Sequence, residues 1–358
     1  MNAHPLTRVV IRGYKSIREC DLHLRRLNVL IGANGSGKSN FLGFFELFQR
    51  MRQGQLQHHV AVKGGPDGLL HHGRKRTDRL AGELHFGDLA YTFTLEPTAD
   101  DRLLIREESF LSAAGADRIV DADRFESGVL TRSGADSAAA RWRSLPDWRT
   151  YHFDDMGESG RIRQRHGIHL NDHLYGDGRN LAAFLYRLQQ QHPEHHRRIV
   201  EVIRQAAPFF AMFSLRPHPD NPEFIDLEWM EKGHDGVMKA HQLSDGTLRF
   251  ACLVTLLMQP PEFMPPVIWI DEPELGLHPA AIGLLGELLH AASVDRQIIC
   301  TTQSVDLVNE FEVEDLVVVE RQEGATVFRR FQENDFQEWL SDYSLGELWL
   351  KNLLGGRP

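Results

Sequence analysis

The sequence contains few cysteines. Its 358 residues include three, Cys20, Cys252 and Cys300, which lie far apart and form no Cys-x-x-Cys pair. Cys252 and Cys300 stand in apolar stretches and are interpreted as small core residues. So sparse and odd a set speaks against a disulfide framework and favours a reducing compartment.

Long apolar runs are also absent. The stretch FACLVTLLM is too short for a membrane span, which needs about 18 apolar residues or more. The N-terminal stretch MNAHPLTRVVIRGYKS lacks the apolar core of a secretory signal. We therefore expect a cytoplasmic protein that has no contact with a membrane.

An excess of positive charge is the third absence. The formal net charge is -10, with 42% hydrophobic and 25% charged residues, which is ordinary globular composition with room for one large domain or two lobes. Nucleic-acid binders are more often basic, so any contact with DNA requires a local basic patch. The basic segments 71–79 and 161–166 are the best candidates, and a solvated surface is the alternative interpretation for both.

The strongest positive signal is the stretch LNVLIGANGSGKSNFLGFFELFQRM. An apolar strand is predicted over 27–31 and a buried helix over 41–51, with the pattern Gly-x-x-x-x-Gly-Lys-Ser over 32–39 between them. This is the strand, loop and helix context that a phosphate-binding loop (P-loop, or Walker A motif) requires. The alternative, a glycine-rich turn that matches by chance, is disfavoured because the whole context is present.

The residue types of this loop explain its chemistry. Gly32, Gly35 and Gly37 let the backbone curl so that its N–H groups point at phosphate, and the helix N-terminus adds positive potential. Lys38 would reach the β- and γ-phosphates of ATP, and the hydroxyl of Ser39 would ligate Mg²⁺.

A second motif, PPVIWIDEPELGLHP, ends an apolar strand over 267–270 in two acids. Because ligands bind at the carboxyl ends of parallel strands, both carboxylates are expected to face the site. Asp271 fits the Walker B role of holding Mg²⁺, and Glu272 fits the role of polarising the attacking water. The alternative is that both acids cap the helix predicted over 280–292.

Two further segments complete the set. The stretch HQLSDGTLRF contains Leu-Ser-Asp-Gly-Thr over 243–247, followed by a predicted helix, and Arg249 is a further positive charge there. The stretch RQIICTTQSVDLVNEF reads as a strand over 297–300 with a polar break over 301–304. Gln303, at the carboxyl end of that strand, is a candidate sensor of the γ-phosphate.

The order Walker A, LSDGT, DEPE-x-GLHP and TTQS resembles the ABC-type ATPase heads of the SMC/RecF group, and more narrowly the stand-alone AAA_21-like ATPases. The resemblance covers residues 8–42 and 241–331 well and the region between them loosely. It implies an α/β P-loop NTPase of the ABC-ATPase-head type with two lobes. One lobe has a mixed sheet around the P-loop helix plus an antiparallel sheet, and a helical lobe carries the signature loop.

The resemblance also implies ATP hydrolysis by a head-to-head homodimer with Mg²⁺ as cofactor. The signature loop, Leu243 to Thr247, would contact the γ-phosphate that the other copy holds. The catalytic residues would be Lys38, Glu272 and Gln303. The nucleotide-binding residues are drawn from the two loops: Asn34, Gly35, Ser36, Gly37, Lys38, Ser39 and Asn40, and Ser244, Asp245, Gly246 and Thr247.

The sequence departs from this pattern at two places. ABC heads usually carry His where this chain has Gln303, which hydrogen-bonds but cannot carry a proton. The Q-loop residue is hard to assign, with His71 or His72 as candidates, and the D-loop is expected over 274–278. The functions left open are an ATP-gated switch in DNA repair, genome maintenance or antiphage defence, and a slow-turnover ATP-binding module that regulates a partner effector. An OLD-type nuclease is disfavoured because no room remains for a Toprim domain.

The rest of the chain is predicted more coarsely. Two strands around Gly87-Asp88 and a third over 103–110 suit an antiparallel sheet, the region 111–170 reads as irregular, and 180–207 reads as two helices. Sustained heptads are absent, which excludes a long coiled coil. We predict one head over 1–358, divided into an N-terminal part, a variable insertion with the helical lobe, the signature, Walker B and sensor strands, and a helical tail: 1–110, 111–240, 241–335 and 336–358.

Overall fold

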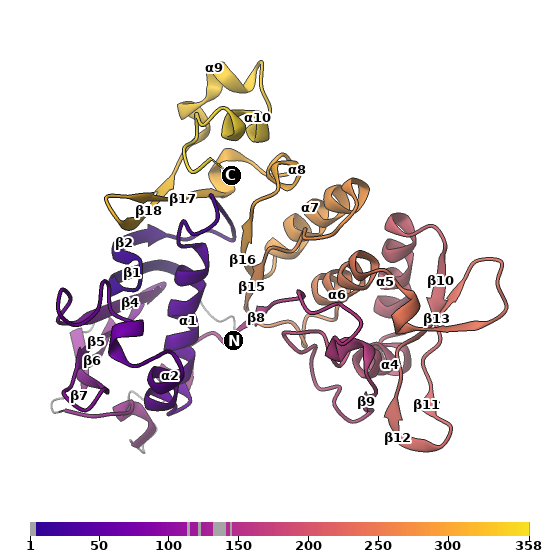
Figure 1. Cartoon of the computed structure of the whole chain (residues 1–358), viewed down its shortest axis with the longest axis horizontal. Coiled ribbons are helices and arrows are strands. Elements are labelled where there is room, and N and C mark those ends of the chain that lie inside the picture. Colours follow the sequence, from indigo (N-terminus) through magenta and orange to yellow (C-terminus); the bar gives the residue numbers. More distant parts are fainter. Residues whose placement is uncertain (1–4, 113–114, 121–122, 132–140, 144, 358) are drawn as a thin grey trace. The chain divides into compact units, whose positions relative to one another are not determined.

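The computed structural model describes residues 5–112, 115–120, 123–131, 141–143 and 145–357. The chain divides into two compact units, each drawn from more than one stretch of sequence. The first unit consists of Met1–Asp147, Val313–Tyr343 and Glu347–Pro358, and the second of Trp148–Glu312 and Ser344–Gly346. Figure 1 labels the helices and strands of both.

An antiparallel sheet forms one layer of the first unit, in the order β2-β1-β4-β5-β6-β7. Burial alternates along β4, as expected for a sheet with one face on a core. The sheet confirms the predicted antiparallel layer. Its strands are β1 (Leu6–Tyr14), β2 (Ile17–His23), β4 (Leu80–Phe86), β5 (Leu89–Pro97), β6 (Leu103–Ser112) and β7 (Gly115–Val120).

A second group of strands in this unit leads into the P-loop helix. Strand β17 runs parallel to β3 and antiparallel to β18, so both pairing directions occur, as predicted. The elements are β3 (Leu27–Ile31), α1 (Lys38–Arg52), α2 (Leu56–Val62), β17 (Leu316–Gln322), β18 (Ala325–Arg330) and α9 (Gln337–Leu340). The short helix α10 (Leu345–Leu350) carries residues of both units.

Aromatic side chains fix helix α1 within the first unit. Phe44 stacks on Phe93 of β5 at 5.9 Å between ring centroids and meets Tyr14 of β1 edge-on at 5.7 Å. On another side, Phe41 packs against Phe328 of β18 at 5.0 Å. Each such pair adds about 0.5–1.5 kcal/mol beyond the apolar area that it buries. The helix is therefore held from the antiparallel sheet and from β18, and its N-terminus has a defined position.

The second unit is built on three parallel strands, in the order β16-β15-β8. These are β8 (Trp148–Tyr151), β15 (Val267–Asp271) and β16 (Gln297–Thr302), and the helices are α4 (Leu181–Gln191), α5 (Pro193–Ala206), α6 (Asp245–Met258), α7 (Pro279–Ser293) and α8 (Val305–Val308). Two small sheets complete it: β10 (Phe210–Phe213), β13 (Glu228–Glu231) and β14 (Val237–Lys239), and β9 (His166–Gly167), β11 (Pro217–His218) and β12 (Asn221–Ile225).

Two local predictions are wrong. The region 111–170 contains strand β8, whose short sequence WRTY mixes buried Trp148 and Tyr151 with polar residues and so gives no apolar run. The polar break predicted over 301–304 begins two residues too early, because Thr301 and Thr302 continue β16 and are buried. Threonine is β-branched and suits a strand, and both hydroxyls find hydrogen-bond partners.

Within the described residues, we find no helix with the length and apolar character needed to cross a membrane.

Candidate functional site

The P-loop, Gly32 to Ser39, joins β3 to α1 in the first unit. Lys38 is buried, with 6% of its surface exposed, and its ammonium group donates to the carbonyl oxygens of Gly32 at 2.5 Å and Ala33 at 3.1 Å. Ser39, in the first turn of α1, is exposed. The loop therefore folds back over its own lysine, while the neighbouring hydroxyl stays accessible.

Strand β18 supports this loop from behind. Gly37 has φ of 118°, and a Cβ placed on it would lie 2.1 Å from the hydroxyl oxygen of Thr326. That hydroxyl donates to the carbonyl oxygen of Ser36 at 2.8 Å and lies 2.7 Å from the Ser16 hydroxyl, which accepts from the amide of Asn40 at 2.7 Å. Only glycine fits at position 37, where the loop turns against the strand.

These features fit a phosphate group. A curled glycine-containing loop stands at the N-terminus of a 15-residue helix, where unpaired N–H groups and the helix dipole attract anions. The buried cation of Lys38 adds charge at the same place. Asn34 and Gly35 are exposed at the tip of the loop, whereas Ser36 is buried. The backbone and one lysine thus supply the anion site.

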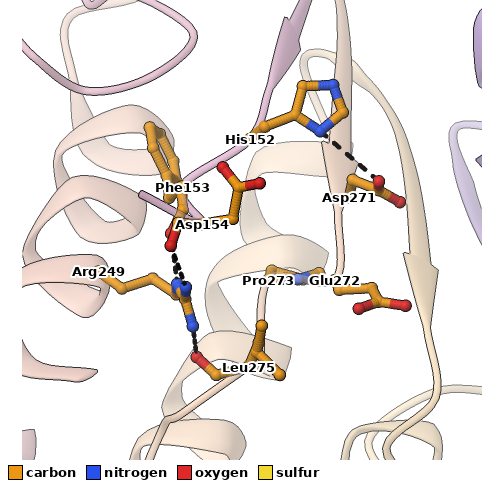
Figure 2. Close-up of a pocket in the computed structure, with 8 residues that line it drawn as sticks. All are labelled: His152, Phe153, Asp154, Arg249, Asp271, Glu272, Pro273 and Leu275. Atoms are coloured by element: carbon orange, nitrogen blue, oxygen red, sulfur yellow. Dashed lines mark hydrogen bonds and ion pairs between the residues drawn. The ribbon is translucent and has the colours of Figure 1, made fainter. Parts of the chain in front are cut away.

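The second unit holds the acid pair at the carboxyl end of β15. The carboxylate of Asp271 accepts a short hydrogen bond from the Thr301 hydroxyl of β16, and Nδ1 of His152 lies 3.6 Å from its other oxygen. Figure 2 shows His152 directed toward Asp271, with Glu272 as the next residue along the chain. A carboxylate, a hydroxyl and an imidazole therefore meet at one place.

His152 is a residue that the sequence analysis missed. It follows β8, which runs parallel to β15 with Tyr151 opposite Ile270. The carboxyl ends of neighbouring parallel strands meet at one edge of a sheet, which explains why His152 reaches Asp271. His71 and His72, considered for the Q-loop, lie instead in the loop before β4, where His71 contacts the Lys15 carbonyl oxygen. Recognising β8 as a strand would have pointed to His152.

Glu272 has an unusual backbone. Its φ is 42°, in the left-handed region that costs a residue with a side chain about 1–2 kcal/mol. Its N–H group compensates by donating to both the carbonyl and the hydroxyl oxygen of Thr301, each at 3.1 Å. The amide of Gln303 donates a short hydrogen bond to the Glu272 carboxylate. Backbone strain at a polar strand end is typical of functional sites.

The signature loop, Leu243 to Thr247, begins helix α6. Ser244 is the N-cap residue, and its hydroxyl oxygen accepts from the N–H group of Thr247 at 3.2 Å. Ser244 and Asp245 are exposed, and a Cβ on Gly246 would lie 2.2 Å from the carbonyl oxygen of Gly276. The loop thus packs closely on the predicted D-loop while its first residues remain open.

Two buried arginines hold this loop. Arg163 donates to the carbonyl oxygens of Ala240 and Leu243, the latter at 3.1 Å, and pairs with Asp245 at 2.5 Å. Arg249 donates to the carbonyl oxygens of Phe153 and Leu275, and burial lowers its pKa (Figure 2). The side chain of Arg249 therefore faces the interior rather than a ligand.

Ion pairs change the interpretation of the two basic segments, 71–79 and 161–166. Within 161–166, Arg163 has a side chain that is 5% exposed, and Arg165 pairs with Asp226 at 3.0 Å. Within 71–79, Arg74 pairs with two aspartates, whereas Lys75 and Arg76 are exposed. The segment 71–79 retains exposed cations, and in the segment 161–166 the side chain of Arg163 is used inside the protein while Arg165 is exposed but paired with Asp226.

A P-loop on a strand–helix junction and an acid pair that ends a parallel strand define the class of P-loop NTPases. The sequence matches the family described as "AAA domain, putative AbiEii toxin, Type IV TA system" over residues 27–309, and the chain belongs to this family. No curated protein matches the sequence significantly.

Solved structures place the fold more closely. One similar structure is described as the Smc head bound to the C-winged helix domain of ScpA, with 14% identity, a TM-score of 0.63, and 93% of this chain and 99% of that chain covered. Another is the Smc head domain with an extended coiled coil bound to the C-terminal domain of ScpA, derived from Pyrococcus furiosus, with 14% identity, a TM-score of 0.54, and coverage of 94% and 98%. The fold is therefore that of an SMC-like ABC-type ATPase head.

Proposed function

We propose that this protein is an ATPase that works as an ATP-gated switch, in which two copies join head to head around bound nucleotide. The observation that carries this proposal is the open N-terminus of α6. Ser244 and Asp245 are exposed there, whereas Leu248 in the next turn is buried. A helix N-terminus with a free approach attracts an anion. The γ-phosphate on a second copy is the anion that the family resemblance suggests.

The ion pair of Asp245 supports this role. A carboxylate in the signature loop would repel a phosphate, but Arg163 pairs with it at 2.5 Å from the protein interior. The pair leaves the Ser244 hydroxyl, the N–H groups of the first turn and Gly246 as the groups that meet the ligand. The loop can therefore serve as an anion site despite its acidic residue.

The remaining residues have complementary roles in this proposal. The P-loop N–H groups and Lys38 bind the phosphates. Ser39 and Asp271 are the residues that would hold Mg²⁺, which would supply charge neutralisation when bound. Glu272 accepts a proton from the attacking water as that water adds to the γ-phosphorus, while the bond from the γ-phosphorus to the bridging oxygen breaks and ADP leaves with that oxygen. Gln303 donates to Glu272 and so fixes the direction of its carboxylate.

Light scattering and ATPase assays test the proposal. Glu272→Gln should bind ATP, fail to hydrolyse it and form a dimer in ATP, and Ser244→Arg should remain a monomer in the same background. Wild-type specific activity should fall on dilution, since the dimer dissociates. An E272Q variant that is monomeric in saturating ATP, or a specific activity independent of protein concentration, would contradict the head-to-head switch.

A slow regulatory ATP-binding module is the second candidate, and Gln303 favours it. An amide at this position hydrogen-bonds but does not transfer protons. Single-turnover measurement separates the two candidates. Hydrolysis slower than roughly one event per hour, far below ordinary enzyme rates, would favour a module that holds ATP and regulates an effector.

Partners are proposed on two grounds. The similar Smc heads are described as bound to domains of ScpA, which supports a partner protein for this head as well. The exposed Lys75 and Arg76 support contact with DNA, in repair, genome maintenance or antiphage defence. A pull-down with the E272Q variant in ATP, probed for protein and for DNA, tests both. A Lys75→Ala/Arg76→Ala variant should lose the DNA and keep the protein partner.

A further inference from the structure

Glu274 is a buried acid for which the proposed reaction has no use. It lies two residues after Glu272, with 9% of its surface exposed. One oxygen of its carboxyl group, Oε1, accepts from the hydroxyl of Thr302 at 2.6 Å and from the N–H group of Gln303 at 3.1 Å. Among the described residues, none donates to the other oxygen, which is also buried. Burying an acid with one oxygen unsatisfied lowers the stability of the folded protein, which suggests that its remaining contacts serve a purpose.

These contacts fix the segment that carries the sensor. The Thr302 hydroxyl also accepts from the N–H group of Ser304 at 3.0 Å, and Ser304 caps helix α8 through the N–H group of Leu307 at 3.2 Å. The backbone from Thr302 to Ser304 is thus held at one residue on each side of Gln303. With its backbone fixed, Gln303 can change only its side-chain rotamer. In the observed rotamer, its amide donates to the Glu272 carboxylate.

The residues that directly follow Glu274 contact the signature helix α6. The carbonyl oxygen of Leu275 accepts from Arg249, and the carbonyl oxygen of Gly276 lies against Gly246. Glu274 therefore stands where the Walker B acid, the sensor and the D-loop are joined by direct contacts. A displacement of the Glu274 side chain would act first on Thr302 and Gln303, which it contacts directly.

We propose that Glu274 is a positioning residue, which holds the backbone of Thr302 and Gln303 so that the Gln303 amide is directed at the Glu272 carboxylate. This inference rests on the roles of Glu272 and Gln303 in the proposed function. Glu274 has no contact with the reacting atoms, and it acts through Gln303.

The electrostatics agree with such a role. Burial raises the pKa of Glu274, and the charge of Glu272 raises it further, while the hydrogen bonds from Thr302 and Gln303 lower it. A glutamine at position 274 keeps the acceptor oxygen in place and removes the charge. Glu274→Gln is therefore the conservative variant, and Glu274→Ala removes the acceptor.

A double-mutant cycle in kcat tests the inference. We expect Glu274→Ala to lower kcat about tenfold with little change in the KM for ATP. This is less than the roughly 10²- to 10⁴-fold that a general base itself contributes, because Glu272 is retained and only its orientation is disturbed. Glu274→Gln should recover most of that loss. In the Gln303→Ala background, Glu274→Ala should have no further effect on kcat, because both changes remove the same interaction.

A control and a second variant separate positioning from folding. Thr255→Ala removes another buried hydroxyl, which donates to the Ala251 carbonyl oxygen at 2.7 Å within α6. It should lower Tm and leave kcat unchanged in both backgrounds. Thr302→Val removes one donor to Glu274, retains the β-branched shape, and should lower kcat in the same non-additive way as Glu274→Ala, which keeps the test decisive if that variant does not fold.

Each result bears on a different claim. Suppose that E272Q is inactive, as the proposed function requires. The positioning role of Glu274 is then overturned if Glu274→Ala keeps the wild-type kcat, or if the reductions of kcat in Glu274→Ala and Gln303→Ala multiply in the double variant. Full activity in E272Q instead overturns the proposed function itself. A wild-type kcat in Gln303→Ala overturns the role of Gln303, and the inference about Glu274 with it.

Discussion

The two groups of candidate residues, one half in each unit, are built in different ways. In the first unit, consecutive residues of one loop make the anion site, and most of the groups that would face phosphate belong to the backbone. In the second unit, side chains from several distant segments meet around Asp271 and Glu272, among them His152, Thr301 and Gln303. The first half is local in sequence, and the second half depends on tertiary contacts.

This difference decides which changes damage each half. A backbone site tolerates many side chains but not a Cβ where the loop turns against a strand. A side-chain site tolerates changes at its exposed rim but not the loss of a buried group that joins segments. Four substitutions probe this comparison, and their expected effects range from loss of nucleotide binding to a few-fold change in the Mg²⁺ requirement.

The largest effect is expected for Gly37→Ala. The new Cβ would lie 2.1 Å from the Thr326 hydroxyl, at a φ of 118° that side chains rarely adopt. Strain and displacement together should cost about 3 kcal/mol or more, which is over a hundredfold in ATP affinity. Fluorescent nucleotide titration measures this affinity.

Gly35→Ala is the matched control for that prediction. Its φ is 75°, but the space around a Cβ there is open. We expect the left-handed backbone alone to cost about 1 kcal/mol, and therefore a loss of less than tenfold. Equal losses in the two variants would mean that Thr326 does not constrain the loop.

The second prediction concerns Arg249→Met in the other unit. Removing the guanidinium leaves the carbonyl oxygen of Phe153, in a buried contact, and that of Leu275, in a partly buried one, without their donor, at a cost of about 2–4 kcal/mol. Thermal unfolding should show a Tm several degrees lower. On dilution, the specific ATPase activity should begin to fall at a higher protein concentration than in the wild type, because the signature loop loses its anchor and the dimer dissociates more readily. Arg165→Ala, which removes an exposed pair with Asp226, should change stability by less than 1 kcal/mol. Similar losses of stability in Arg249→Met and Arg165→Ala would show that the burial of an arginine does not determine how much it contributes to stability.

The local half of the site was readable from the sequence, because its determinants are close together. Strand β3 and the P-loop were predicted with their observed bounds, and the helix predicted over 41–51 lies within α1. Glycine spacing and one apolar strand suffice for such a motif. The place of Asp271 and Glu272 at the carboxyl end of a strand was predicted for the same reason, since both directly follow an apolar run.

The tertiary half was only partly predictable. Arg249 was interpreted as a charge near the ligand, yet it is buried and bonded to loops about 26 and 96 residues away in sequence. His152 was missed because β8 has no apolar pattern. Glu274 was predicted only as the first residue of the D-loop, and its partners, Thr302 and Gln303, lie 28 and 29 residues further on. Spacing along the chain carries no signal for such pairs.

The third prediction concerns His59, which packs beneath the P-loop helix. It is 3% exposed and lies 3.8 Å from Glu46 of α1, and burial lowers its pKa to about 4. An unfolded histidine has a pKa of about 6.5, so between these values the unfolded state binds more protons. The stability contributed by neutral His59 is complete above pH 6.5 and is lost as the pH falls toward 4.

His59→Gln should therefore flatten the acid limb of the stability profile. We expect the wild type to lose about 2 kcal/mol more than the variant between pH 7 and pH 4.5, measured by urea unfolding. His58→Gln is the matched control, because His58 is exposed on the same helix. Parallel stability profiles for wild type and His59→Gln would contradict this, since they would mean that His59 binds its proton as readily in the folded as in the unfolded protein.

The smallest effect is expected for His152, at the exposed rim of the side-chain half. Its ring is 45% exposed and 3.6 Å from Asp271, so solvent weakens any charge contact. His152→Ala should raise the Mg²⁺ concentration needed for half-maximal ATPase about threefold, because one polar group near the carboxylate proposed to hold Mg²⁺ is removed, and His152→Gln should restore it. Thr301→Val, which removes the buried hydroxyl donor to the same carboxylate, should have a clearly larger effect. If His152→Ala were the more damaging of the two, the exposed rim and not the buried partner would set the position of Asp271, and the contrast between the two halves of the site would have to be drawn differently.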